Sequence, residues 1–313
     1  FGVDDLIADI RKRLGPVAPE SNVRGERRIR MAFVGRPNVG KSSLCNRLLD
    51  AERLIVSDVP GTTRETTMRE LDYQAEQDET WRFCLFDTAG LRQRKKIADS
   101  LEYFSSLRTE EAINRTDVAL LVLDAREGVS KQDKVMAGLI AESGKALVVL
   151  VNKWDVAVQG FRRDPLSGYK NESHFRKEYE KAIRKELFVL PGFPILFVSA
   201  KTGLAIEDML SAVREVDQGL DRFLPTPELN RAIIGMMENR PPAARKGKRF
   251  KIFYAVQTNT RPFTIRLFCN RIDRLEDGYQ RYLANGLTTR FDLLGAPLRF
   301  ILSGKEARYS KKN

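Results

Sequence analysis

The sequence predicts an α/β protein with a doubly wound, mostly parallel sheet, followed by a smaller α+β domain. The first observation is a set of short apolar runs at residues 29–34, 80–87, 117–124, 146–153 and 193–200. The second is that stretches with helical spacing separate most of these runs. This alternation is typical of parallel strands whose connecting helices cover both faces of one sheet. The third is a change of order after Gly219, where a helix, two strands, a helix and a strand follow one another.

Helices are predicted where apolar residues recur at helical spacing between the runs. In the first domain these are residues 43–49, 98–114, 130–143, 173–187 and 206–216. In the second domain, LPTPELNRAIIGMMENRPP predicts a capped helix, with Thr226 before Pro227 at the first turn and Pro241-Pro242 as its stop. The strands KIFYAVQ, FTIRLFC and LRFIL, together with a helix over residues 278–288, complete an αββαβ unit that is similar to a KH fold.

The apolar runs of the first domain end at polar groups or glycine. These end residues are Gly35, Asp87, Asp124, Asn152 and Ser199. In open parallel sheets, ligands bind outside the carboxyl ends of the strands. We therefore expect these residues to cluster at one edge of the sheet and to form a binding site.

Composition limits the class of protein. At 313 residues and 42% hydrophobic content, the chain can bury a sizeable core in two domains. No apolar run approaches the roughly 20 residues of a membrane-spanning helix. Cys45, Cys84 and Cys269 are odd in number and widely separated, which fits neither a disulfide framework nor a metal cluster. We expect a reduced, cytoplasmic protein with no membrane partner.

The net charge of +12 lies almost entirely in the last third of the chain. Residues 219–313 contain 19 Lys and Arg against 8 Asp and Glu, whereas the preceding residues are nearly balanced. A basic module beside a neutral one suggests a polyanionic partner, most often nucleic acid. A well-solvated surface is the alternative interpretation.

GRPNVGKS, from Gly35 to Ser42, matches the phosphate-loop pattern and lies between a strand and a helix. Its glycines allow close approach of the backbone, and its N–H groups with the helix N-terminus can bind an anion. Lys41 would reach the β- and γ-phosphates, and Ser42 would bind Mg²⁺. The predicted nucleotide contacts here are Gly35, Arg36, Pro37, Asn38, Val39, Gly40, Lys41, Ser42 and Ser43.

Three further motifs follow in the order that a GTP-binding protein needs. DTAG closes a strand, where Asp87 can hold Mg²⁺ through water and the Gly90 amide can contact the γ-phosphate. NKWD ends another strand, and the Asp155 carboxylate can accept the paired donors of guanine, which adenine lacks. SAK follows the last strand and can support the base through backbone N–H groups. The predicted contacts are Asp87, Thr88, Ala89, Gly90, Leu91, Asn152, Lys153, Trp154, Asp155, Ser199, Ala200 and Lys201.

PGTTR, at residues 60–64, lies where a switch for the γ-phosphate belongs. Thr63 is the expected second Mg²⁺ ligand and Thr62 the less favoured one. A plain turn with solvated threonines is the alternative.

These motifs resemble those of the translation-factor-like bacterial GTPases, and the match narrows to one family. GRPNVGKSSL, SDVPGTTRE, DTAGLRQRKK, EYFSSLRTEEAINRTDVALLVLDA, SKQD and VVLVNKWD are similar to the second GTPase domain of the Der (EngA) family. That family has two tandem GTPase domains followed by a KH-like domain, and KIFYAVQ, RPFTIRLFCN, YQRYLANGL and GAPLR are similar to the latter. The resemblance runs from about residue 27 to about residue 302.

The resemblance also gives an expected division of the chain. FGVDDLIADIRKRL is similar to LAIEDMLSAVREVD at residues 204–217, which would form the last helix of a GTPase domain. Residues 1–14 are therefore expected to be the final helix of an earlier GTPase domain, and residues 15–26 a linker. A GTPase domain over residues 27–218, the KH-like domain over 219–304 and a basic tail over 305–313 would follow.

For catalysis, the resemblance implies a Mg²⁺-dependent GTPase that is slow without its partner. Leu91 stands where many GTPases have a glutamine that orients the attacking water. The resemblance points to GTPases that instead recruit K⁺ near the phosphates, with Asn38 as its ligand; the alternative is that Asn38 only stabilises the loop. Asn38, Lys41, Thr63 and Gly90 form the expected catalytic set.

For partners, the resemblance implies assembly of the large ribosomal subunit, contact with its rRNA, a first GTPase domain in the longer chain, and a monomer. No GxxG follows Gly219, so the usual KH clamp on nucleotides is in doubt, and the polar stretch 270–277 departs from the family. Lys246, Lys248 and Arg249 are the candidates for phosphate contact. Two alternatives stay open: an RNA-binding scaffold that hardly hydrolyses GTP, and a GTPase of tRNA modification, which would be expected to end in a helical domain with a cysteine.

Overall fold

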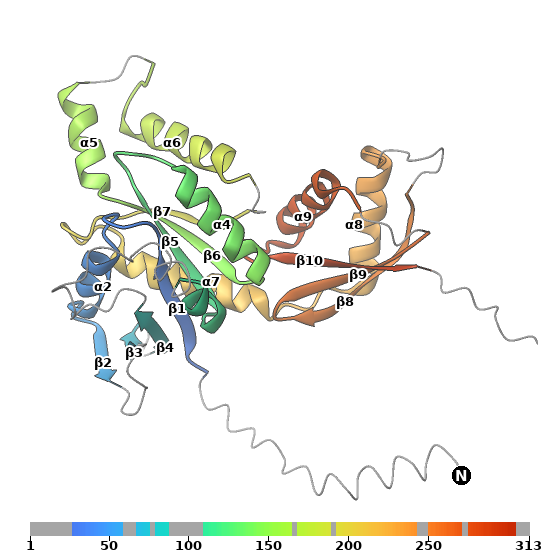
Figure 1. Ribbon diagram of the computed structural model, residues 1–313, viewed down its shortest axis with the longest axis horizontal. Helices are drawn as coiled ribbons and strands as arrows, with labels where there is room; N and C mark the ends of the chain where they lie inside the picture. Colours follow the sequence, from blue (N-terminus) through green and yellow to red (C-terminus); the bar gives the residue numbers. More distant parts are fainter. Residues whose placement is uncertain are drawn as a thin grey trace, which may run out of the picture.

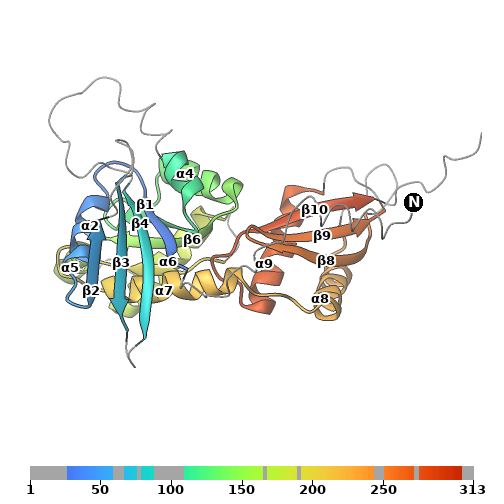
Figure 2. The same ribbon diagram turned by 90° about the horizontal axis from the view of Figure 1, so that it is seen from below.

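The computed structural model describes residues 27–58, 67–75, 79–87, 109–164, 168–188, 192–242, 250–270 and 275–304. Within these ranges the chain forms two sheets that lie side by side along the long axis of the molecule (Figures 1 and 2). The predictions for residues 1–26, 243–249 and 305–313 lie outside the described residues.

The larger sheet has the strand order β2-β3-β4-β1-β5-β6-β7. Its strands are β1 (Ile29–Val34), β2 (Leu54–Asp58), β3 (Thr67–Gln74), β4 (Thr80–Asp87), β5 (Val118–Asp124), β6 (Ala146–Asn152) and β7 (Ile195–Phe197). β1 pairs in parallel with β4 and β5, and β6 pairs in parallel with β5 and β7, whereas β2 and β3 are antiparallel. The predicted doubly wound, mostly parallel sheet is therefore confirmed, with β2 and β3 as an edge that the sequence did not predict.

Helices cover both faces of this sheet (Figure 1). They are α2 (Lys41–Leu49), α4 (Lys131–Ser143), α5 (Trp154–Arg163), α6 (Glu172–Glu186) and α7 (Ile206–Leu220). Alternate residues of β5 explain the two layers: Leu120 belongs to the core cluster with α2 and α7, and Leu121 to the cluster with α4, α5 and α6. Both side chains are fully buried. A strand that is buried on both faces has a continuous apolar sequence, which is why β5 could be predicted from the sequence.

The second domain contains α8 (Thr226–Asn239), β8 (Ile252–Thr260), β9 (Phe263–Cys269), α9 (Asp277–Phe291) and β10 (Leu298–Gly304). The predicted αββαβ order is confirmed. The sheet order is β10-β9-β8, with β10 parallel and β8 antiparallel to β9. Figure 2 shows α8 and α9 on the same side of this sheet.

Several predicted boundaries shift in the structure. α8 has Pro225 as its N-cap and no side-chain cap hydrogen bond, so Thr226 is its first residue rather than a cap. Of the helix predicted over residues 98–114, residues 109–114 are described and are helical, and the helix continues to residue 115. α5 was not predicted, because it follows a strand-end motif directly. In the described part of the chain, no helix is both long and apolar enough to cross a membrane.

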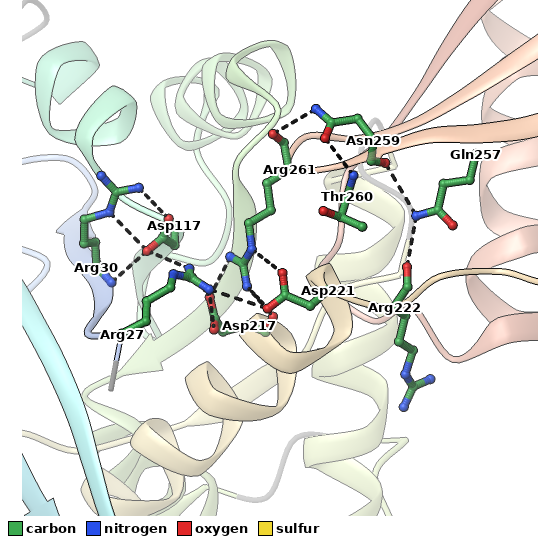
Figure 3. Close-up of polar contacts among 10 residues, drawn as sticks. All are labelled: Arg27, Arg30, Asp117, Asp217, Asp221, Arg222, Gln257, Asn259, Thr260 and Arg261. Atoms are coloured by element: carbon green, nitrogen blue, oxygen red, sulfur yellow. Dashed lines mark hydrogen bonds and ion pairs between the residues drawn. The ribbon is translucent and has the colours of Figure 1, made fainter. Parts of the chain in front are cut away.

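An ionic cluster joins the two domains (Figure 3). Arg261, in the turn between β8 and β9, donates through Nη1 to Asp217 Oδ1 at 2.8 Å and through Nε to Asp221 Oδ1 at 2.7 Å. Both aspartates lie at the end of α7. Arg27, just before β1, also reaches Asp217 Oδ1 at 3.0 Å. We call Arg27, Arg30, Asp117, Asp217, Asp221 and Arg261 the junction cluster.

Backbone contacts tie the domains together as well. Gly295, in the loop between α9 and β10, accepts a hydrogen bond from the Leu147 N–H of β6 at 3.0 Å and donates to the Gly192 carbonyl at 2.8 Å. Its φ is +74°, and a Cβ there would lie 2.8 Å from the Leu147 oxygen and 2.9 Å from the Val216 side chain. This contact therefore requires glycine. One buried apolar cluster runs without a break from α2 and α7 into α8, α9 and the smaller sheet.

Candidate nucleotide-binding site

The loop from Gly35 to Gly40 connects β1 to α2 at the carboxyl edge of the larger sheet. Gly35 has a φ of +150°, and a Cβ there would lie 2.7 Å from the Val122 carbonyl oxygen of the neighbouring strand. Gly40 has a φ of +99°, and its Cβ would collide with the Asn152 side-chain amide. Both glycines are therefore needed for the loop to fit between the strands.

Lys41 and Ser42 begin α2, so the loop leads directly into a helix N-terminus. The Lys41 ammonium donates to the carbonyls of Gly35 at 2.6 Å and Arg36 at 2.8 Å. The first N–H groups of a helix point outward and carry the positive end of its dipole. The loop thus combines a cation with outward-facing N–H groups, an arrangement suited to phosphate.

The Arg36 side chain points towards α4 and fixes the loop from outside. It forms an ion pair with Glu127 and another from Nε to Asp133 Oδ2 at 3.3 Å. Asp133 is fully buried and belongs to a capping box with Ser130, whose backbone N–H donates to Asp133 Oδ2 at 2.9 Å. Arg36 is a predicted nucleotide contact, whereas its partner Asp133 was not predicted, although Ser-x-x-Asp is a capping-box signal.

Asn152, at the end of β6, connects the phosphate loop to the SAK segment. Its Nδ2 donates to the Val39 carbonyl at 2.9 Å, and its Oδ1 accepts from the Ala200 N–H at 3.2 Å. The side chain is 1% exposed. Because both ends of the amide are used and the group is buried, Asn152 fixes the two loops relative to each other.

Lys153 is the N-cap of α5 and has a left-handed backbone, with φ +64°. Its ammonium donates to the Asn38 carbonyl at 2.8 Å and to Asp124 Oδ2 at 2.7 Å. Burial alone would raise the pKa of Asp124, but hydrogen bonds from Arg126 and Lys153 hold it well below its ordinary value. Asp124 therefore stays ionised and keeps Lys153 on the phosphate loop.

Asp155 lies in the first turn of α5, where a helix N-terminus favours a carboxylate. The Ser199 hydroxyl donates to Asp155 Oδ1 at 2.7 Å and accepts from the Thr202 N–H at 3.2 Å. The SAK segment thus orients the carboxylate of the NKWD segment. Arg47 of α2, which was not predicted to lie at the site, donates to the carbonyls of Ala200 at 2.9 Å and Lys201 at 2.6 Å.

Like Val39, which is 1% exposed, Trp154 is a predicted nucleotide contact whose side chain packs in the core. It is 6% exposed and lies 4.3 Å, centroid to centroid, from the Phe197 ring. Asp87 is the last residue of β4, which pairs with β1, so its backbone lies on the same edge of the sheet as the phosphate loop. Thr62, Thr63, Thr88, Ala89, Gly90 and Leu91 lie outside the described residues.

The phosphate loop, the NKWD segment and the SAK segment lie at the carboxyl edge of one sheet. This arrangement defines a P-loop nucleotide-binding domain, which is followed here by a KH-like domain. Two family models match the chain: "50S ribosome-binding GTPase" over residues 30–153 and "KH-domain-like of EngA bacterial GTPase enzymes, C-terminal" over residues 224–302. The chain belongs to the Der (EngA) family.

Among relatives, GTPase Der of Alkaliphilus oremlandii is 39% identical over 98% of this chain and 66% of its own length. GTPase Der of Caldanaerobacter subterraneus subsp. tengcongensis is 40% identical over 95% of this chain and 63% of its own length. The chain therefore spans slightly less than two thirds of these relatives. Among solved structures, Aquifex aeolicus Era bound to GDP and AlF4⁻ is 20% identical over 88% of this chain and 92% of that one, with a TM-score of 0.42.

Proposed function

We propose that this chain binds GTP with Mg²⁺, hydrolyses it to GDP and phosphate, and acts in assembly of the large ribosomal subunit. The observation that best supports this is the side chain of Asn152, which connects the phosphate loop to the SAK segment. It contacts Val39 on one side and Ala200 on the other. Because Asn152 holds the two segments next to each other, one nucleotide could place its phosphates in the phosphate loop and its base at the SAK segment.

At the phosphate end, the N–H groups of residues 35–42 and the Lys41 ammonium would bind the β- and γ-phosphates. Ser42 in α2 carries an oxygen donor of the kind that Mg²⁺ takes, Thr63 is proposed as the second ligand, and Asp87 at the end of β4 would hold the ion through water. When bound, Mg²⁺ would offset charge on the phosphates. The proposed contacts of Gly90 and Leu91 complete this end.

At the base end, Asp155 would accept hydrogen bonds from two guanine donors at once. Its orientation by Ser199 supports this role, because a fixed carboxylate loses little freedom on binding. The Lys153 stem would lie along the base, and its ammonium already bonds to Asn38 and Asp124. Preference for guanine would then rest on a carboxylate that the protein itself holds in place.

Hydrolysis is proposed to depend on K⁺ bound by Asn38, since Leu91 cannot orient water by hydrogen bonding. Asn38 is exposed, has a φ of +66° and accepts from Lys153 through its carbonyl, so its backbone is fixed while its side chain is accessible. A cation there would stabilise charge that develops on the phosphates.

The experiment measures release of phosphate from GTP with and without K⁺ and purified large ribosomal subunits. We expect turnover that rises with both, and its loss in Lys41→Ala. Lys131→Ala, at an exposed position in the first turn of α4, is the matched control and should leave turnover unchanged. Tight GTP binding with no turnover under any of these conditions would favour the alternative, an RNA-binding scaffold that keeps nucleotide for shape.

A further inference from the structure

The smaller sheet has one face covered by helices and one face with exposed side chains. α8 and α9 lie on one side of it, and Ile265, Leu267 and Leu283 are buried between the layers. The residues that alternate with these on the strands point to the other side. Tyr254, on that side, is 47% exposed.

The exposed residues of neighbouring strands lie next to one another in register. Tyr254 pairs with Phe268, and Arg266 pairs with Ile301. Phe268 is 37% exposed, Ile301 is 39% exposed, and Arg266 is also exposed. We call Tyr254, Phe268, Arg266 and Ile301 the open-face patch.

The two aromatic rings of the open-face patch lie 5.9 Å apart with their planes at 47°. Since they are tilted rather than stacked on each other, each can offer a face to a flat ligand. The patch lies away from the first domain, because the β8–β9 turn at Arg261 and the start of β10 at Arg299 face the junction. The first domain therefore leaves the open-face patch accessible.

Charge on this sheet has one sign. Among the residues of β8, β9 and β10 the only charged side chains are Arg266 and Arg299, and none is acidic. Lys251, just before β8, is exposed as well. A module with an excess of eleven positive charges, an acid-free sheet and two exposed rings fits a polyanion with flat groups, and nucleic acid combines these features along a chain.

We propose that the open-face patch binds unpaired RNA, with bases stacked on Tyr254 and Phe268 and a phosphate at Arg266. Exposed aromatics on an open sheet bind splayed-out bases in other RNA-binding folds, because every base has a π-face. Paired RNA keeps its bases inside the helix, so it cannot supply this contact. The inference rests on the proposed role at the ribosome. It identifies an RNA-binding surface that is separate from the basic loop at residues 246–249.

The test compares Tyr254→Leu and Phe268→Leu with the unmutated protein by fluorescence anisotropy of a labelled, unstructured RNA decamer. Leucine keeps an apolar side chain on the strand but removes the stacking face. Stacking is worth about 1–3 kcal/mol per base, a factor of about 5 to 150, and leucine retains part of the contact. We therefore expect about fivefold weaker binding for each variant, and Arg266→Gln should flatten the salt dependence by about 0.7.

Phe223→Leu is the matched control, because Phe223 is 73% exposed but lies in the connection between α7 and α8. It should bind the decamer as the unmutated protein does. In a second readout, a decamer with 4-thiouridine should crosslink to peptides that contain Tyr254 or Phe268. Equal affinity of the leucine variants, equal binding of a duplex of the same length, or crosslinks elsewhere would overturn the proposal.

Subunit binding and GTP turnover in the same preparations separate this inference from the proposed function. If the unmutated protein neither turns over GTP nor binds large subunits, the proposed function fails. If it does both and the leucine variants bind RNA normally, only the open-face inference fails. A concentration-dependent dimer that the leucine substitutions dissociate would show that a second copy of this chain covers the patch, and would also overturn the RNA assignment.

Discussion

Replacing Arg261 by Met should weaken the attachment of the KH-like domain, because one guanidinium serves two carboxylates of α7. Asp217 is 8% exposed, and it loses a charged hydrogen bond of 2.8 Å. Such a bond is worth about 1.5–3 kcal/mol, towards the lower end here since Arg27 still pairs with Asp217. Asp221 is 57% exposed, so losing its ion pair with Arg261 adds about 0–1 kcal/mol. We expect Arg261→Met to lower the free energy of unfolding by about 1.5–3 kcal/mol.

Arg27 also pairs with Asp217, so a double variant provides a second test of the same prediction. Arg27 is 44% exposed, so Arg27→Met alone should cost about 1 kcal/mol. In the double variant Asp217 loses both guanidinium partners while staying buried, which is the costly case for a charge. The double variant should therefore exceed the sum of the single losses by about 1 kcal/mol.

The assay is urea unfolding followed by tryptophan fluorescence and far-ultraviolet circular dichroism. Arg231→Met, at an exposed position of α8, is the matched control and should change stability by less than about 0.5 kcal/mol. A loss below about 0.5 kcal/mol for Arg261→Met, or strict additivity in the double variant, would refute the reasoning.

Acid should weaken the same cluster. Burial would raise the pKa of Asp117, but hydrogen bonds from the Arg30 side chain and N–H lower it to about 2. A lowered folded-state pKa means that the stabilisation is complete above the unfolded value of about 4 and is lost as the pH falls towards 2. The shift corresponds to about 2 kcal/mol, and Asp117→Asn should remove this part of the pH dependence.

Three further predictions concern the proposed sites. Asp155→Asn should weaken GTP binding by about 2–4 kcal/mol and shift preference towards xanthosine nucleotides, which calorimetric titration can measure; unchanged GTP affinity would remove Asp155 from base recognition. Unmutated protein should turn over GTP faster in K⁺ than in Na⁺ at equal ionic strength, and Asn38→Ala should abolish the difference; equal rates in both salts would contradict the cation role. Replacing Lys246, Lys248 and Arg249 together with Ala should flatten the salt dependence of large-subunit binding by roughly two units of slope. A lower melting temperature with an unchanged slope would mean that this loop packs on the protein instead.

The sequence predicted the elements whose pattern is local. β1, β5 and β6 are apolar throughout because they are buried on both faces, and the loops after β1 and β6 carry motifs of fixed spacing. β3 was missed because, among its described side chains, the buried Leu71 and Tyr73 are separated by polar residues and form no continuous apolar run. Its polar face gives it no apolar run.

Contacts between distant residues could not be predicted in the same way. The pairing of Arg36 with Asp133, of Arg47 with the SAK segment, and of Arg261 with α7 each joins residues far apart in the chain. Nothing in the local sequence around any of these arginines identifies its distant partner. Only the fold shows which of them have a carboxylate or carbonyl within reach.

The hydrogen bond from Leu147 to Gly295 has a consequence for how this protein can be divided. β7 pairs with β6 at residues 149–151, and the start of β6 is completed by the loop after α9 from the other domain. A chain cut after α7 would leave that part of a strand with unsatisfied backbone groups, which is where proteins pair with one another and aggregate. The first domain thus depends on a loop of the second domain to complete the hydrogen bonding of an edge of its own sheet. The two domains should therefore be expressed together as a single unit.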